Sequence, residues 1–227
     1  MAIVITRKLD RRYGHGAHAV QALRGVDIVI ETGEFTALMG PTGSGKTTLL
    51  ELIGGLEAPS GGSVQLDGQN IGSMDGTKRF AFGIERLGFV FQAYNLIPVL
   101  TAYHNTQLVL ELQGVPRAER RERVLRALQD VGLEGMEQCL PADLDAGQQQ
   151  RLALARAIVG EPALVLADEP TTNLNADTGC ALLDTMRELN ERLGITFLFA
   201  TQDPKVMKRA RRVVKLVDGR VDEDLRK

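Results

Sequence analysis

The chain has 227 residues, 44% of them hydrophobic, which is enough for one α/β domain with a substantial core. Its formal net charge of −2 gives no overall basic field, which argues against a nucleic-acid partner. The apolar runs fall short of the roughly 20 residues that cross a bilayer, and basic residues interrupt the N-terminal region, so neither a spanning helix nor a signal segment is expected. These features predict a cytosolic protein that touches a membrane only through a partner.

The first third of the chain has the pattern of β-strands. Short apolar stretches at residues 4–5 and 26–30 indicate two strands, and a third follows at residues 35–39. Residues 63–66 precede the pair Asp67-Gly68, a combination typical of a tight hairpin turn in which both residues have positive φ.

Between the third strand and a predicted helix lies a glycine-rich loop of the form G-x-x-x-x-G-K-[ST]. The loop consists of Gly40, Pro41, Thr42, Gly43, Ser44, Gly45, Lys46 and Thr47. The glycines let backbone N–H groups turn around a phosphate, and Lys46 supplies a cation for the β- and γ-phosphates. The Thr47 hydroxyl can bind Mg²⁺, and Thr48 continues into a helix whose positive dipole end faces the anion. The loop predicts a nucleoside triphosphate site.

The middle of the chain reads as a helical insertion between two sheet-forming parts, roughly residues 93–160. It follows a short strand that ends at Gln92, and helical periodicity returns after Pro116 and over residues 148–159. The pairs Glu119/Arg123 and Glu122/Arg126 are four residues apart, a spacing typical of ion pairs on a solvated helix face. We therefore expect these charges to serve the helix and not a nucleic acid.

The second half of the site follows the insertion. The apolar run at residues 163–167 predicts a strand buried in a parallel sheet, and it ends in Asp168-Glu169. Asp168 can hold Mg²⁺ against the phosphates, and Glu169 is placed to orient or deprotonate an attacking water. A helix around residues 182–193, a strand at 196–200 and a final hairpin at 213–219 complete the expected elements.

Residues 144–151 (LDAGQQQR) and 167–170 (ADEP) together resemble the ATP-binding subunit of ABC transporters, whose first motif is L-S-G-G-Q-x-Q-R. The resemblance covers essentially the whole chain, with the motifs in the family order. Residues 53–56 and 91–98 look closest to the lipoprotein-release and macrolide-export branch. The resemblance implies a P-loop NTPase fold, with a parallel sheet, an antiparallel β subdomain and the α-helical insertion, in one domain over residues 1–227 without a C-terminal regulatory domain.

The resemblance also implies site residues and partners. Tyr13 matches the aromatic residue that stacks on adenine, and Gln92 matches the glutamine that senses Mg²⁺ and links to the membrane subunit. The residues that match the segment covering the ATP of a second subunit are Asp145, Ala146, Gly147 and Gln148. The implied cofactors are ATP and Mg²⁺. The implied partners are a second ATP-binding subunit and an integral membrane permease held by the helical subdomain, at the inner face of the cell membrane.

Four positions depart from the family pattern. Asp145 replaces a serine, Ala146 a glycine and Asn175 an aspartate, and Gln202 stands where the family has its switch histidine. An ionised Asp145 cannot donate to a γ-phosphate, and Gln202 can bond one but cannot shuttle a proton. Glu169 and Gln202 are thus the candidate catalytic residues.

Three interpretations stay open on the sequence. The first is an ATPase subunit of an exporter or a lipid-handling complex, with either slow or ordinary turnover. The second is an ATP-dependent clamp with little turnover, which includes the degenerate half of a heterodimer. The third is a soluble ABC protein of repair or translation. The paired domains or coiled coil typical of that class are not found in this sequence.

Overall fold

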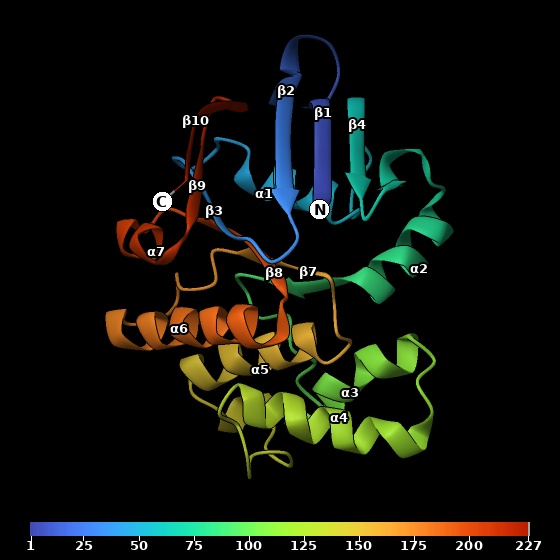
Figure 1. The fold of residues 1–227 in the computed structure, drawn as a ribbon, viewed down its shortest axis with the longest axis vertical. Helices are drawn as coiled ribbons and strands as arrows, with labels where there is room; N and C mark the ends of the chain where they lie inside the picture. Colours follow the sequence, from blue (N-terminus) through green and yellow to red (C-terminus); the bar gives the residue numbers. More distant parts are fainter. Residues whose placement is uncertain (227) are drawn as a thin grey trace.

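The structure, a computed structural model, describes residues 1–226, apart from the side chains of residues 17, 204 and 205. Two sheets lie one above the other, with helix α1 (Lys46–Ile53) packed against strands of both, and further helices cover the opposite face of the larger sheet (Figure 1). Within the described part of the chain, no helix has the length and apolar character needed to cross a bilayer.

The larger sheet is the core of the fold and carries the site. Its strand order is β10-β9-β3-β8-β7-β6, and all neighbours are parallel except β10 and β9. The bounds are β3 (Phe35–Met39), β6 (Leu87–Val90), β7 (Leu164–Asp168), β8 (Thr196–Thr201), β9 (Arg212–Val217) and β10 (Arg220–Arg226). Helices cover one face and α1 the other, so β7 and β8 are buried almost throughout, which explains their continuous apolar sequence.

The register of this sheet brings distant parts of the sequence together. Met39 pairs with Thr201 across β3 and β8, and Asp168 pairs with Ala200 across β7 and β8. Because parallel strands end at the same edge of a sheet, the loops that follow β3, β7 and β8 meet there. The expected parallel sheet is confirmed.

The smaller sheet is antiparallel, with strand order β2-β1-β4-β5, as the sequence predicted. Its strands are β1 (Ala2–Tyr13), β2 (Val20–Glu31), β4 (Gly61–Leu66) and β5 (Gln69–Asn70). Asp67 and Gly68 have φ values of 48° and 75°, so the predicted tight turn between β4 and β5 is present. Tyr13 lies at the end of β1, opposite Val20.

The helices between β6 and β7 pack on one another and on the larger sheet, in the lower half of Figure 1. They are α3 (Ala102–Leu112), α4 (Arg117–Asp130) and α5 (Ala146–Ile158), and α6 (Ala176–Leu193) follows β7. The sequence did not predict α2 (Gly76–Arg86) or α7 (Pro204–Arg209), it gave α3 no bounds of its own within the helical insertion, and it placed the start of α6 too late. The helix α2 has only 11 residues, its apolar side chains are concentrated in residues 80–84, and none of its residues is buried, so it lacks the long apolar periodicity of a core helix. The first turn of α6 is likewise polar and is fixed by its N-cap, where Asn175 accepts from the Thr178 N–H at 2.9 Å.

One of the two predicted ion pairs on α4 is wrong. Arg126 and Glu122 form their pair at 2.9 Å, but Arg123 turns away from Glu119. Its guanidinium donates to the Val159 carbonyl at 3.3 Å and lies 3.4 Å from Glu161, at the C-terminal end of α5. Unpaired carbonyls at the C-terminal end of a helix attract cations, so Arg123 binds at the end of α5 and does not form the weaker ion pair with Glu119.

The buried side chain of Arg212 links strand β9 to β2, to β10 and to the residue that precedes β3. Arg212 of β9 donates to Glu34 before β3 (2.8 Å), to the Val29 carbonyl of β2 (2.6 Å) and to Asp224 of β10 (2.7 Å). Its side chain is only 6% exposed. Hydrogen bonds from the Arg212 guanidinium hold the pKa of Asp224 below its usual range, while burial opposes this shift.

Replacing Arg212 by alanine should lower the free energy of unfolding by about 2–4 kcal/mol, because it leaves two carboxylates without their buried partner. The matched control is Arg211→Ala, which removes an exposed pair with Glu191 and should cost less than about 1 kcal/mol. A carboxyl whose pKa is depressed in the folded state stabilises the fold above its ordinary pKa, and that contribution is lost as the pH falls through the folded value. In urea titrations the difference between wild type and Arg212→Ala should therefore shrink between about pH 7 and about pH 3. A pH-independent difference would mean that Arg212 acts through packing alone.

Candidate active site

The loop between β3 and α1 has backbone geometry that only glycine tolerates easily. Gly40, Gly43 and Gly45 have φ values of 155°, 79° and 101°. A Cβ on Gly40 would collide with the Leu216 carbonyl, and one on Gly45 would come within 2.7 Å of the Ala22 carbonyl. The glycines are thus needed both for the turn and for the close packing of the loop on its neighbours.

Lys46 is buried at the first position of α1, as expected for the cation of this loop. Its ammonium group donates to the carbonyls of Gly40 (2.8 Å) and Pro41 (3.2 Å). It lies 3.9 Å from Oε1 of Glu169, so the start of α1 and the end of β7 bring two opposite charges to the same space. Thr48 lies two residues further along α1, where its side chain interacts with the hydroxyl of Tyr13.

Two of the three predicted metal ligands, Thr47 and Asp168, are in contact at this edge of the sheet. The Thr47 hydroxyl donates to Oδ2 of Asp168 at 2.8 Å, while Oδ1 of Asp168 is buried without a hydrogen-bond partner among the described residues. Burial raises the pKa of Asp168, and the hydrogen bond from Thr47 opposes the shift. A hydroxyl beside a partly unsatisfied carboxylate is the donor set that Mg²⁺ prefers, so these residues fit the ion.

Glu169 and Gln202 form a bridge to the phosphate loop. Gln202 donates through Nε2 to Oε1 of Glu169 at 3.1 Å, and its Oε1 accepts from the Thr42 hydroxyl at 3.1 Å. The other oxygen of Glu169 accepts from Thr172 at 3.2 Å. Glu169 has a φ of 46°, an uncommon value for a residue with a side chain and one that recurs at functional sites. The structure thus brings both candidate catalytic residues to the loop.

Gln92 is exposed just after β6, at the start of a loop that is held from two sides. The Gln92 carbonyl accepts from Asn173 at 3.1 Å, and Arg156 of α5 donates to the carbonyls of Tyr94 (2.8 Å) and Asn95 (2.6 Å). Tyr94 and Asn95 both have positive φ, 58° and 52°. The sequence pointed to Gln92 but not to Arg156, whose only signal is a basic residue within the apolar second half of α5.

The segment with the degenerate family motif starts α5. Asp145 accepts from the Gln148 N–H at 2.8 Å, and the Gln148 side chain accepts from the Asp145 N–H at 2.9 Å, which together form a capping box. The carboxylate therefore stabilises the helix N-terminus, which gives the aspartate a structural role. Gly147 packs so closely on Thr178 that a Cβ would lie 2.5 Å from its methyl group. Among the described residues, no hydrogen bond or ion pair joins Asp145, Ala146, Gly147 or Gln148 to the phosphate loop of the same chain.

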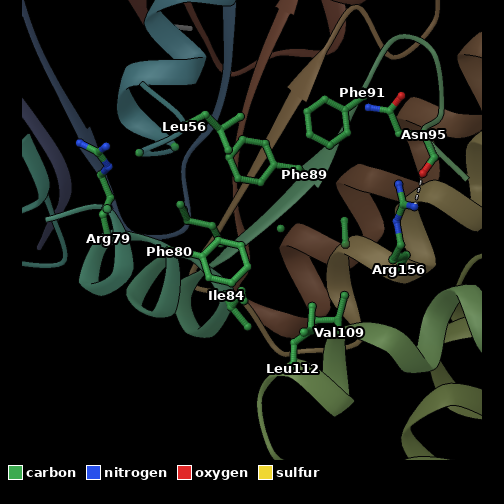
Figure 2. A pocket seen from close by; sticks show the side chains of 17 residues that line it. Leu56, Arg79, Phe80, Ile84, Phe89, Phe91, Asn95, Val109, Leu112 and Arg156 are labelled. Atoms are coloured by element: carbon green, nitrogen blue, oxygen red, sulfur yellow. Dashed lines mark hydrogen bonds between the residues drawn. The ribbon is translucent and has the colours of Figure 1, made fainter. Parts of the chain in front are cut away.

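A groove of about 450 Å³ lies on the outer side of β6, between α2 and the helices α3 and α5 (Figure 2). Its walls are largely apolar, and Phe80 and Leu112 remain 64% and 56% exposed. Arg79 and Arg156 line it, no acidic residue does, and neither arginine has an ion pair within the described chain. Burial lowers the pKa of Arg156.

Comparisons with known proteins agree with this geometry. Residues 23–172 match the family model described as ABC transporter. The chain is 39% identical to the lipoprotein-releasing system ATP-binding protein LolD of Legionella pneumophila, over 96% of both chains. It is 42% identical to the macrolide export ATP-binding/permease protein MacB of Rhodopirellula baltica, over 96% of this chain but only 32% of that longer protein.

A solved structure is similar over nearly the full length. The cassette MJ0796, captured as a dimer in a post-hydrolysis state with ADP and Pi, superposes with a TM-score of 0.91 at 36% identity, covering 98% of both chains. The parallel sheet, the antiparallel sheet and the helices of this chain thus form the fold of an ABC cassette. The chain belongs to the ABC transporter family, on the branch of the lipoprotein-release and macrolide-export ATP-binding proteins.

Proposed function

We propose that the protein is the ATP-binding subunit of a transport complex, which closes with a second ATP-binding subunit on ATP and couples hydrolysis to a membrane partner. The observation that carries this proposal is the convergence of Lys46, Asp168-Glu169 and Gln202 at the carboxyl ends of β3, β7 and β8. A triphosphate in the glycine-rich loop would meet all three groups at its γ-phosphate.

The phosphate loop supplies binding in this scheme. Its backbone N–H groups surround the phosphates, Lys46 exchanges its bonds to loop carbonyls for phosphate oxygens, and α1 directs its positive end at the anion. Residues 40–48 form this subsite, and Tyr13 stacks on the base. The second subunit covers the nucleotide with its residues equivalent to 145–148.

Thr47 and Asp168 would hold Mg²⁺, with Gln92 as a third ligand from β6. The ion, when bound, would neutralise charge on the β- and γ-phosphates. Glu169 orients and deprotonates the attacking water, and its carboxylate is held toward the site by Thr172 and Gln202. Gln202 donates its amide to Glu169 or to the γ-phosphate, but it cannot carry a proton as a histidine does.

The groove of Figure 2 would receive a helix of the membrane subunit, at the inner face of the cell membrane. Residues 93–160 form the subdomain that provides one side of the groove, with Val109, Leu112 and Arg156. Charge complementarity favours a helix with an apolar face for Phe80 and Leu112 and a carboxylate for Arg79 or Arg156, because the described groove offers two cations and no anion. Arg156 also holds the turn at Tyr94 and Asn95, so a helix seated here would act on α5 and on Gln92 together.

A clamp with little turnover is the second candidate, favoured by Gln202 in place of a histidine. The capping role of Asp145 weakens the other argument for it, since that carboxylate is engaged with its own helix. A heterodimer, in which a partner with the common motifs completes one competent site, combines both functions.

Replacing Lys46 by alanine should weaken ATP binding about 10- to 100-fold, because charge-assisted hydrogen bonds to the phosphates are lost. Isothermal titration calorimetry with Mg-ATP measures this directly. Lys78→Ala is the matched control, since Lys78 is 78% exposed on α2 and should leave affinity unchanged. Equal affinities for wild type and Lys46→Ala would refute the proposed function.

A further inference from the structure

Arg11 covers one face of the Tyr13 ring. The guanidinium carbon lies 4.6 Å from the centre of the ring, within the range of a cation–π contact. The two residues are two positions apart on β1, so their side chains lie on the same side of the strand, whereas Arg12 between them is exposed on the other side. A base can therefore stack on Tyr13 from the remaining face only.

Glu57 fixes both members of this stack. The Tyr13 hydroxyl donates to Oε2 of Glu57 at 2.7 Å, and Nε of Arg11 lies 2.9 Å from the same oxygen. Arg11 also donates through Nη1 to the carbonyl of Ala58 at 2.8 Å. Burial and the neighbouring Glu57 raise the pKa of Tyr13, so its hydroxyl keeps its proton and remains a donor.

The stack is also tied to the phosphate loop. Glu57 and Ala58 belong to the segment that leaves α1, the helix that begins with Lys46, and Thr48 of that helix contacts the Tyr13 hydroxyl. A half-exposed tyrosine normally samples several ring orientations, and holding one of them costs conformational entropy when a ligand binds. Here contacts within the chain already hold the ring at a set position relative to the phosphates.

We propose that Arg11 and Glu57 are positioning residues for base recognition, which hold the Tyr13 ring so that the base of the nucleotide stacks on the face opposite Arg11. The inference rests on the proposed function and deepens it. On this view the protein prefers a nucleotide to a bare triphosphate chain because of this stack, which lies outside the phosphate loop.

The test compares two ligands, Mg-ATP and Mg-tripolyphosphate, by calorimetry on the full chain. Arg11→Ala should weaken ATP binding about three- to fivefold and leave tripolyphosphate binding unchanged. Arg12→Ala removes the same charge one residue away, from a side chain without a hydrogen bond or ion pair to the described residues, and should change neither affinity. Arg11→Lys keeps the charge but loses the planar stack and the fork of donors, so it should restore ATP binding only in part.

A loss of equal size for both ligands in a folded Arg11→Ala protein would overturn the inference, since Arg11 would then act through charge at the phosphates. No loss for either ligand would overturn it as well. If Arg11→Ala does not fold, Glu57→Gln is the second test variant. It keeps the size of the side chain and weakens the ion pair with Arg11. It should lower the affinity for ATP and leave the affinity for tripolyphosphate unchanged; unchanged ATP affinity would overturn the inference. The proposed function has a separate test: it would be refuted if the wild-type chain bound neither ATP nor tripolyphosphate.

Discussion

Glu169→Gln is expected to slow ATP turnover at least about 100-fold while ATP binding stays equal or becomes tighter. The substitution keeps the shape of the side chain, and an amide oxygen can still accept from Thr172 or Gln202. It removes the group that accepts the proton of the attacking water. It also removes a negative charge 3.9 Å from the Lys46 ammonium, where the terminal phosphate would lie.

Steady-state phosphate release gives the turnover, and calorimetry with Mg-ATP gives the affinity. Glu122→Gln is a suitable control, because Glu122 is 78% exposed on α4 and far from the edge of the sheet that carries the site. A folded Glu169→Gln protein with turnover close to that of wild type would remove Glu169 from the chemistry. If ATP closes two subunits on each other, this variant should also accumulate as a dimer in size-exclusion chromatography with ATP.

Gln202→His has the opposite expected effect: turnover should rise about 10- to 100-fold if the missing histidine limits the wild-type chain. A histidine at this position can donate to Glu169 or to the γ-phosphate as the glutamine does, and it can in addition exchange a proton near neutral pH. The gain should appear in kcat more than in KM, since the wild-type amide already bridges Thr42 and Glu169.

Gln202→Ala provides the comparison, because it breaks the bridge without adding a proton carrier and should lower turnover. The double variant Gln202→His with Glu169→Gln should show no gain, since the two groups act as a unit. Turnover of Gln202→His at or below the wild-type level would instead show that the glutamine is a compensated substitution. It would then favour an ordinary ATPase over the clamp.

Asp145 and Gln202, the two substitutions that suggest slow ATP hydrolysis, have different roles in the structure. An ionised Asp145 cannot donate to the γ-phosphate of an ATP held by a second subunit. Its carboxylate is bound to the first turn of α5, so the charge is partly offset by the helix dipole. Gln202 remains the substitution that bears most directly on catalysis.

The local parts of the site could be predicted from the sequence. Lys46 and the left-handed glycines of the phosphate loop act within eight residues, and Asp67-Gly68 needs only its own backbone preference. The run before Asp168 is apolar throughout because both faces of β7 are covered, and that pattern can be recognised in the sequence. Features that depend on neighbouring residues can therefore be predicted from the sequence.

The contacts that join the site depend on strand order and register. Gln202 meets Thr42 across 160 residues and Glu169 across 33, only because β3, β8 and β7 lie side by side and end at the same level. Arg156 reaches the carbonyls of Tyr94 and Asn95, and Arg123 prefers the end of α5 to its own helix neighbour, for the same kind of reason. The sequence by itself determined which chemical groups the protein brings to a triphosphate. The tertiary structure decided which of them touch, because pairing in a sheet and packing between helices set distances that spacing along the chain does not contain.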